Sequence, residues 1–442
     1  MPDLHTDYQP YTEPDIEPKK RRSGKARLGT PKSVGPLDWE KIRREFVFQP
    51  GIIYLNSGTE GSMPKPVLSQ YSVYLQKWAS SPSYFFAFSE VMDDWQKRNR
   101  EKVAQFLGTT LDNICLTNNT SEGLSMTALG LNFKAGDEVI STLQDFPSSE
   151  SVFHVLQKTR GIVYTQLPLP TPTVSKEEII AAFKTSITPK TRALCFSHIN
   201  YTTGLRMPAK ELCDLARENN LISIVDGAHA LGMIPLDVEA MGCDFYATSG
   251  HKWLNGPPGT GVLYIRDAQH NPFGLVPIIS ELYGFETAYT IVEMLQIRGC
   301  NNTPGFTAMV DAIEFNQNIG KETIEDRILE LNTYLKNRVV KEWGEQCLLS
   351  PPGEDTHSLS SGIASFIPSK DYWKRYDKEF INDLSWKIIG DYKIWIRSIS
   401  FLDKCSDGNK LTYAIRVSTN LFNNFEDIDK LMAALREVAS KI

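Results

Sequence analysis

One stretch decides the fold of this chain: residues 248–261, with the sequence TSGHKWLNGPPGTG. It places Lys252 between the end of a predicted strand and a loop rich in glycine and proline. A second stretch upstream, residues 222–229 (ISIVDGAH), predicts a buried strand that ends at Asp226. We expect the two strands to be neighbours in a sheet, so that the lysine and the aspartate meet at one edge of it.

This pair of residues suits pyridoxal 5'-phosphate (PLP) chemistry. The amine of Lys252 would condense with the cofactor aldehyde, and the carboxylate of Asp226 would pair with the pyridine nitrogen. A lone Ser-x-His-Lys would be weak evidence, whereas the two stretches together are much stronger.

The composition excludes several other classes of protein. The chain has 442 residues, 41% of them hydrophobic, and a net charge of −6, and no basic stripe with interleaved aromatics suggests nucleic acid. Its seven cysteines are scattered without metal-ligand spacing, so we expect no metal site and a reducing cytoplasmic location. No apolar run approaches the ~18 residues of a membrane helix, so we expect no membrane partner.

Patterning predicts four segments. Residues 1–36, rich in proline and charge, would form a flexible polar arm, and residues 37–55 would pack with a small domain. Residues 56–310 alternate short β-rich runs with helical patterns, which predicts an α/β domain with a mainly parallel sheet flanked by helices. Residues 311–442 predict a smaller α+β domain.

The chain resembles the class V aminotransferases, which are PLP-dependent transferases of fold type I. The resemblance runs from about Ile53 to Leu435 and rests on five ordered matches. These matches are Tyr54-Leu55-Asn56-Ser57-Gly58, Asn119-Thr120-Ser121-Glu122-Gly123, Ser197-His198 through Thr203-Gly204, Val225-Asp226-Gly227-Ala228-His229 and Gly250-His251-Lys252-Trp253-Leu254.

The resemblance assigns most of a cofactor site. It makes Lys252 the residue that holds PLP and Asp226 the partner of the ring nitrogen. It also implies a phosphate site at a helix N-terminus, where free N–H groups favour an anion. The residues that it places around the phosphate are Thr120, Ser121, Ser249 and His251.

Further residues surround the cofactor ring in the family. His229 would contact the phenolic oxygen or the substrate, or else be a core histidine, and Phe146 would stack on the ring face. Tyr201 stands where relatives often carry asparagine, so either Asn200 or the Tyr201 hydroxyl would serve there. Fold type I enzymes are homodimers with sites completed across the interface, and in the family a threonine reaches the phosphate of the neighbouring subunit. Cys300 stands in the place of this threonine.

The substrate would be a small molecule with an amino-acid group. Arg416 matches the arginine that binds the α-carboxylate, since a planar guanidinium pairs with a carboxylate through two hydrogen bonds. Asn56 is assigned to substrate as well. Arg397 would be a second carboxylate ligand or belong to a surface ion pair. The aromatic run 83–88 would line the entrance or pack at an interface.

The reaction stays open among several alternatives. Epimerisation at Cα needs a second acid, for which Tyr201, His154 or a water are candidates, whereas transamination needs only Lys252 to move the proton. A cysteine desulfurase or C–S lyase would use a thiolate, and Cys405 lies in a polar loop between the two arginine strands. A non-catalytic PLP-binding regulator is the alternative of another class.

Overall fold

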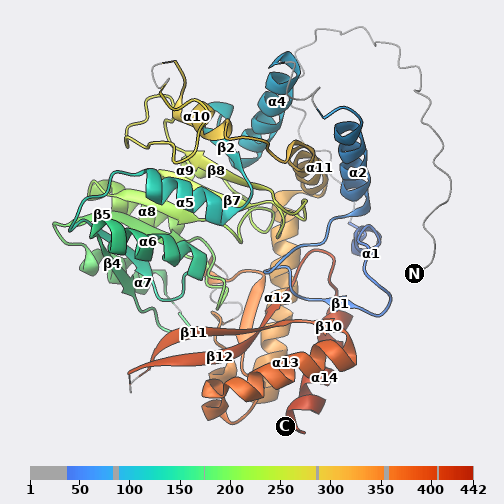
Figure 1. Cartoon of the computed structure of the whole chain (residues 1–442). Helices are drawn as coiled ribbons and strands as arrows, with labels where there is room; N and C mark the ends of the chain where they lie inside the picture. The colour runs from blue at the N-terminus through green and yellow to red at the C-terminus, as the bar shows by residue number, and fades with distance from the viewer. Residues whose placement is uncertain are drawn as a thin grey trace, which may run out of the picture. The chain divides into compact units, whose positions relative to one another are not determined.

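The computed structural model describes residues 37–82, 89–173, 175–284, 288–352, 358–405 and 408–441 (Figure 1). Residues Trp39–Ile442 form one compact unit. The predicted arm 1–36 and the aromatic run 83–88 lie outside the described residues, so their roles stay predictions.

A seven-stranded sheet forms the centre of the molecule, as the alternation of strands and helices predicts. Its strand order is β2-β8-β7-β6-β5-β3-β4, and β8 alone runs antiparallel to its neighbours. The strands are β2 (Ile114–Thr117), β3 (Glu138–Thr142), β4 (Val163–Leu167), β5 (Thr191–Ser197), β6 (Ile222–Asp226), β7 (Phe245–Ser249) and β8 (Gly261–Ile265).

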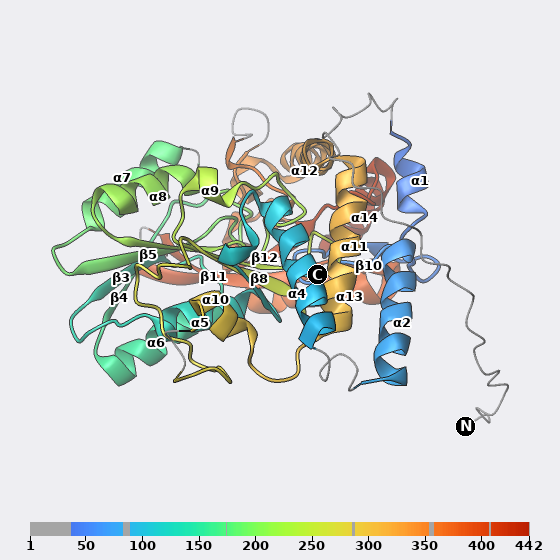
Figure 2. The same cartoon turned by 90° about the horizontal axis from the view of Figure 1, so that it is seen from above.

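Helices cover both faces of this sheet, which explains why its inner strands are almost wholly buried. Figure 2 shows α7, α8 and α9 on one face and α5, α6 and α10 on the other. These helices are α5 (Thr120–Gly130), α6 (Pro147–Arg160), α7 (Lys176–Ser186), α8 (Ala209–Glu218), α9 (Val238–Met241) and α10 (Ile291–Gln296).

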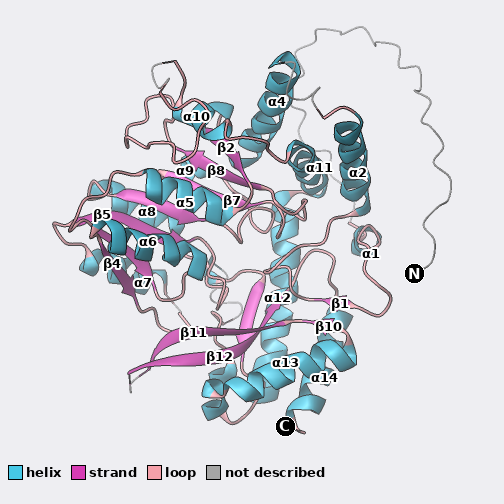
Figure 3. Cartoon of the chain, in the orientation of Figure 1, coloured by secondary structure: helices cyan, strands magenta, loops and turns pink. Residues whose placement is uncertain are grey.

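A second, smaller sheet follows in the chain, with the antiparallel order β11-β12-β9. Figure 3 shows helices beside it. The elements of this part are α12 (Lys321–Trp343), β9 (Ile363–Phe366), α13 (Lys378–Tyr392), β10 (Ile394–Trp395), β11 (Arg397–Cys405), β12 (Gly408–Ser418) and α14 (Phe425–Ala439). The predicted α/β fold with a smaller α+β part is therefore confirmed.

The start of the described chain contacts both parts. Strand β1 (Ile53–Tyr54) pairs in parallel with β10, and helix α11 packs against α2 and α4. The other α-helices of the described residues are α1 (Trp39–Arg43), α2 (Lys65–Ser80), α4 (Ser89–Leu107) and α11 (Thr303–Ile319). The predicted boundaries at residues 55 and 310 stay predictions.

The loop after β5 joins the two sheets. Gly204 has a φ of +70°, and a Cβ there would lie 2.3 Å from the carbonyl oxygen of Ile363 in β9. The Ser365 hydroxyl donates to the carbonyl of Thr202, which fixes the same contact. This loop therefore holds Tyr201 beside the small sheet, where a site at the strand ends can use residues from both sheets.

Candidate active site

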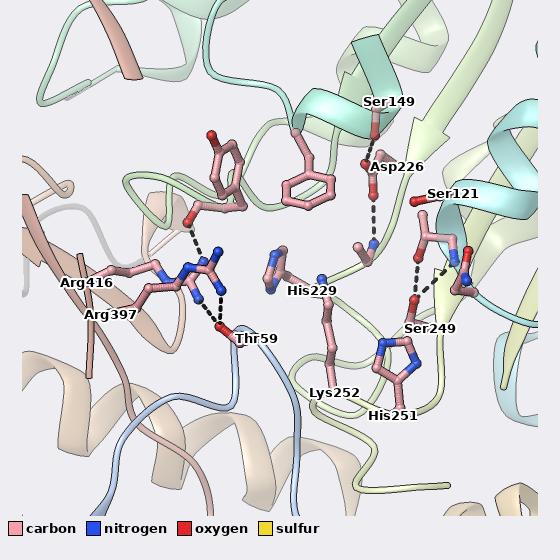
Figure 4. Close-up of a pocket in the computed structure, with 16 residues that line it drawn as sticks. Thr59, Ser121, Ser149, Asp226, His229, Ser249, His251, Lys252, Arg397 and Arg416 are labelled. Carbon is pink, nitrogen blue, oxygen red and sulfur yellow. Dashed lines mark hydrogen bonds between the residues drawn. The ribbon is translucent and has the colours of Figure 1, made fainter. Parts of the chain in front are cut away.

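A pocket of about 270 Å³ lies at the carboxyl ends of β6 and β7 (Figure 4). It brings together residues from the large sheet, the small sheet and the segment after β1. It is lined by Gly58, Thr59, Asn119, Thr120, Ser121, Phe146, Ser149, Tyr201, Asp226, Ala228, His229, Ser249, His251, Lys252, Arg397 and Arg416. Most of the predicted site residues therefore lie around one cavity.

Lys252 lies in the middle of this group (Figure 4). Burial lowers the pKa of its amine from the ordinary value of 10.5 to about 8, against the opposing charge of Asp226. Its Nζ has no hydrogen-bond acceptor within the described part of the chain, and it lies 5.7 Å from the centre of the Phe146 ring. A buried amine with a lowered pKa and no acceptor is suited to act as a nucleophile.

Asp226 ends β6, and two donors hold its carboxylate. The Ser149 hydroxyl donates to Oδ2 at 2.5 Å, and the backbone N–H of Ala228 donates to Oδ1 at 2.9 Å. Asp226 itself is 4% exposed. These contacts fix a negative charge at the sheet edge, which is what a protonated ring nitrogen requires.

The N-terminus of α5 forms the opposite end of the pocket from the arginines. Asn119 caps the helix by accepting from the N–H of Glu122, and the Thr120 hydroxyl lies 2.7 Å from that of Ser249. The Ser121 hydroxyl lies 2.6 Å from that of Ser148. The positive end of the helix dipole and several hydroxyls together make a site for a phosphate.

His251 adds a polar atom beside Ser249 in this end of the pocket. Its Nδ1 is buried and has no hydrogen-bond partner among the described residues. Burial, followed by the charge of Lys252, lowers the pKa of the ring. Because a buried unpartnered nitrogen is costly, it favours a bound polar group here.

His229 is held in one tautomer. The indole N–H of Trp253 donates to its Nδ1 at 3.1 Å, so the ring proton is on Nε2. Burial, with the charges of Lys252 and Arg416, lowers its pKa well below the ordinary value, so the ring is neutral. Phe146 contacts Tyr201 edge to face, with the ring centres 5.0 Å apart, and the two rings form another wall of the pocket.

Arg416 and Arg397 lie on the far side of Lys252 from Ser249 (Figure 4). Arg416 is 2% exposed and donates to the Tyr201 carbonyl at 3.1 Å and to the Thr59 hydroxyl at 2.9 Å. Arg397 is exposed and donates to the same hydroxyl at 3.1 Å. No carboxylate of the described residues forms an ion pair with either guanidinium, so this end of the pocket is suited to an anion.

Three predicted site residues lie outside the pocket lining. Asn56 contacts the site indirectly, through a hydrogen bond of 3.4 Å from Arg416. Asn200 is fully buried, and neither of its amide atoms has a partner among the described residues. Cys300 is exposed and does not line the pocket. Their assigned roles stay predictions.

Two other candidates lie elsewhere. His154 is exposed on α6, with its ring against Tyr164, and does not line the pocket. Cys405 ends β11 and pairs with Gly408 at the start of β12, so two long strands take the place of most of the expected loop. The side chain of Cys405 lies outside the described residues.

The sequence analysis missed two residues that hold the site together. Ser149 comes three residues after Phe146, and its role depends on the approach of α6 to the end of β6. Thr59 directly follows the matched segment that ends at Gly58, and its hydroxyl accepts hydrogen bonds from both arginines. The signal for each was its place beside a quoted motif, but neither contact is local in sequence.

The segment that carries Thr59 is fixed against the lysine loop. The N–H of Gly61 donates to the carbonyl of His251 at 2.8 Å, and a Cβ on Gly61 would lie 1.8 Å from the carbonyl oxygen of Lys252. Only glycine fits this approach. Residues 56–61 thereby become part of the pocket wall.

The fold and the site define a PLP-dependent enzyme of fold type I. The family model described as "Aminotransferase class-V" matches residues 53–431, and the chain belongs to this family.

Relatives with curated names include enzymes of different reaction types. The chain is 26% identical over 430 residues to isopenicillin N epimerase of Amycolatopsis lactamdurans, covering 91% of this chain and 98% of the relative. It is 24% identical over 346 residues to hercynylcysteine sulfoxide lyase of Schizosaccharomyces pombe, covering 76% and 88%. Among solved structures, the apo cysteine desulfurase of Thermococcus onnurineus NA1 superposes with a TM-score of 0.73 at 22% identity, covering 91% and 98%.

The cofactor is pyridoxal 5'-phosphate, and the residues present fit it. Lys252 would hold its aldehyde carbon, Asp226 its ring nitrogen, and Ser249 with the α5 N-terminus its phosphate. The buried, unpartnered Nδ1 of His251 and the lowered pKa of the Lys252 amine are the two observations of the structure that this cofactor explains.

Proposed function

We propose that this protein acts at the Cα of an amino acid or of a small molecule that bears an amino-acid group, as an epimerase or an aminotransferase. The observation that carries this proposal is Arg416, a buried arginine with no carboxylate partner among the described residues, in the same pocket as the half-buried Lys252, whose amine has a lowered pKa. When bound, PLP withdraws electrons from Cα and makes its proton acidic.

The residues of the chain divide the remaining work. Arg416 binds the α-carboxylate and fixes the orientation of the substrate, while the amine of Lys252 takes and returns the proton at Cα. Asp226 supplies the negative charge for the ring nitrogen. Phe146 and Tyr201 cover one side of the pocket and restrict the access of water.

An epimerase needs a second acid on the other face of Cα. Of the residues considered for this role, Tyr201 lines the pocket whereas His154 does not. Burial raises the pKa of the Tyr201 hydroxyl, so it is protonated at neutral pH and can donate. We therefore assign the second acid to Tyr201 for the epimerase form of the proposal.

A direct experiment tests the proposal. The purified protein with PLP is treated with borohydride, and peptide mass spectrometry should find reduced cofactor on Lys252, whereas the Lys252→Ala variant should show none. A panel of L- and D-amino acids is then screened for a change in cofactor absorbance and for deuterium incorporation at Cα. If no cofactor is trapped at Lys252, or if no amino acid responds, the proposal is wrong.

The same assay separates the two reaction types. An epimerase exchanges the Cα proton of both enantiomers and interconverts them, and Tyr201→Phe should block the interconversion while exchange from one enantiomer persists. An aminotransferase instead releases a keto acid, and its Tyr201→Phe variant should remain active.

C–S bond cleavage is the second candidate, because hercynylcysteine sulfoxide lyase is among the relatives. Strands rise about 3.3 Å per residue, so the backbone of Cys405 lies roughly 26 Å along β11 from Arg397. Within one chain this distance places Cys405 away from the pocket, so a lyase reaction without a protein thiolate is the form that we favour. Release of sulfide or a sulfenate product from cysteine derivatives, unchanged in Cys405→Ala, would support it.

We also propose a cytoplasmic homodimer. None of the described helices has the length and apolar character needed to cross a membrane. The described residues also contain no group of three or more potential ligands arranged for a metal ion.

Lys252, Asp226 and Arg416 lie around one pocket, which argues against the non-catalytic regulator, because a regulator needs no carboxylate-binding arginine.

A further inference from the structure

Two arginines of the pocket stand directly opposite each other in the small sheet. The β11–β12 register pairs Arg397 with Arg416. Like charges at directly opposed positions of an antiparallel pair are unfavourable. Both guanidiniums also donate to one atom, the hydroxyl oxygen of Thr59, which brings them close together.

No described acidic residue neutralises this pair. No carboxylate of the described residues forms an ion pair with either arginine, and the charge of Arg397 is one of the causes that lower the pKa of Arg416. The acidic residue in the pocket lining is Asp226, and both its oxygens are engaged by Ser149 and Ala228. A bound anion is therefore suited to compensate the charge of this pair.

The phosphate of the cofactor does not supply this charge. Figure 4 shows Ser249 and His251 on the other side of Lys252 from the two arginines. The substrate is the remaining source of negative charge at this end of the pocket.

One carboxylate balances only one of the two guanidiniums. Arg416 is buried, and its Nε–H has no acceptor among the described residues, so it is placed to bind the deep α-carboxylate. Arg397 is exposed and makes one hydrogen bond to the described residues, with Thr59, so it can offer further N–H groups to a ligand at the mouth of the pocket. The two arginines thus lie at different depths.

We propose that Arg397 is a specificity-determining residue that binds a second carboxylate of the substrate, so that the enzyme prefers amino-acid substrates carrying a second acidic group. This inference rests on the proposed function, because it takes the α-carboxylate to be bound by Arg416. It adds the class of substrate, an acidic amino acid or a larger molecule with a carboxylate beyond the amino-acid group.

The test compares acids with amides of the same shape. L-aspartate, L-glutamate and L-2-aminoadipate are titrated into the PLP-loaded protein beside L-asparagine and L-glutamine, and dissociation constants are measured by cofactor absorbance and by calorimetry. An acid should bind roughly tenfold more tightly than its amide, which is the size of a charge-assisted hydrogen bond at a partly exposed site.

Variants of Arg397 identify the source of the preference. Arg397→Gln should bring the acid-to-amide ratio close to 1 by weakening the acid alone, and Arg397→Lys should retain part of the preference. Arg192→Gln is the matched control, since Arg192 is an exposed arginine in β5 outside the pocket and its loss changes the net charge equally.

Two results would overturn the inference while leaving the proposed function intact. Equal affinity for acids and amides in the unmodified protein shows that no second acid is selected. If Arg397→Gln weakens the binding of acids and amides equally, Arg397 binds the α-carboxylate together with Arg416. If no ligand of the panel binds and Arg416→Gln changes nothing, the proposed function itself is wrong, and the inference is wrong with it.

Discussion

At the residue scale, the charge state of Lys252 controls how the cofactor is taken up. Burial lowers the pKa of its amine to about 8, so in the protein without cofactor the reactive amine fraction rises with pH and reaches half of its maximum near pH 8. We predict that the rate of covalent PLP attachment, trapped by borohydride, follows this curve. A midpoint near 10.5 would show that the amine is not buried as the structure has it.

Arg416 provides a second check on the same titration. Its positive charge is one of the causes that lower the pKa of Lys252. The variant Arg416→Gln removes this repulsion, so the pKa should rise and the attachment curve should move to higher pH. Arg436→Gln, at an exposed ion pair with Glu342, should leave the curve in place.

Ser149 is the residue that keeps Asp226 in position. Ser149→Ala removes the 2.5 Å hydrogen bond to a buried carboxylate, which should lower the free energy of unfolding by about 1–3 kcal/mol and weaken PLP binding. Urea denaturation and a cofactor titration measure the two effects. Ser151→Ala, which removes an exposed hydroxyl in the same helix, is the control and should change little.

The candidate site was predictable to the extent that its residues share local motifs. Lys252 and Asp226 follow strands that the pattern of apolar residues defines, and the structure places both in one pocket. Thr59 and Ser149 could not be found in this way, because Arg397 and Arg416 are more than 300 positions from Thr59 in the chain and α6 must pack before Ser149 meets Asp226.

At the element scale, the loop between β5 and the small sheet depends on Gly204. Gly204→Ala imposes a left-handed conformation on a residue with a Cβ, at about 1–2 kcal/mol, and adds a clash with the Ile363 carbonyl. We predict a loss of unfolding free energy well above 2 kcal/mol, with weaker substrate binding because the Tyr201 carbonyl that accepts from Arg416 moves.

Gly136 offers the matched control for this prediction. Its φ is +85°, yet a Cβ there would meet nothing within 4 Å. Gly136→Ala should therefore cost only the left-handed backbone term. If the two variants are equally stable in urea, the contact between the loop and β9 is weaker than the structure indicates.

Most elements follow from hydrophobic patterning, but the β11–β12 hairpin does not. The segment 401–408 predicts a polar loop, whereas the strands continue to Cys405 and resume at Gly408. The backbone of one strand supplies the hydrogen bonds of the other, so pairing extends the strands beyond what the side chains suggest. Long-range pairing of this kind is not visible in a local pattern.

At the scale of the whole molecule, an apolar segment before α10 is exposed in the single chain. Ile279 is 59% exposed and Tyr283 is 64% exposed, and the chain continues from here to Cys300. Exposed apolar patches of this kind mark interfaces, and a homodimer would cover this one. We predict that light scattering finds twice the mass of one chain.

The variant Ile279→Lys tests which surface is used. It should dissociate the dimer and weaken PLP binding, because the partner would no longer complete the phosphate site. Val163→Lys places the same charge at the exposed edge strand β4, where lysine is tolerated, and should remain dimeric. A monomeric unmodified protein would contradict both predictions.

The opposed arginines of β11 and β12 also bear on how this protein is handled in the laboratory. Two cations that no described carboxylate pairs, one deep in the pocket and one at its mouth, attract small oxyanions in solution, including the sulfate, phosphate and citrate of common buffers. Such ions would compete with substrate and lower its apparent affinity. Chloride salts of tertiary-amine buffers at low ionic strength are therefore the conditions under which the true preference of the enzyme would be measured.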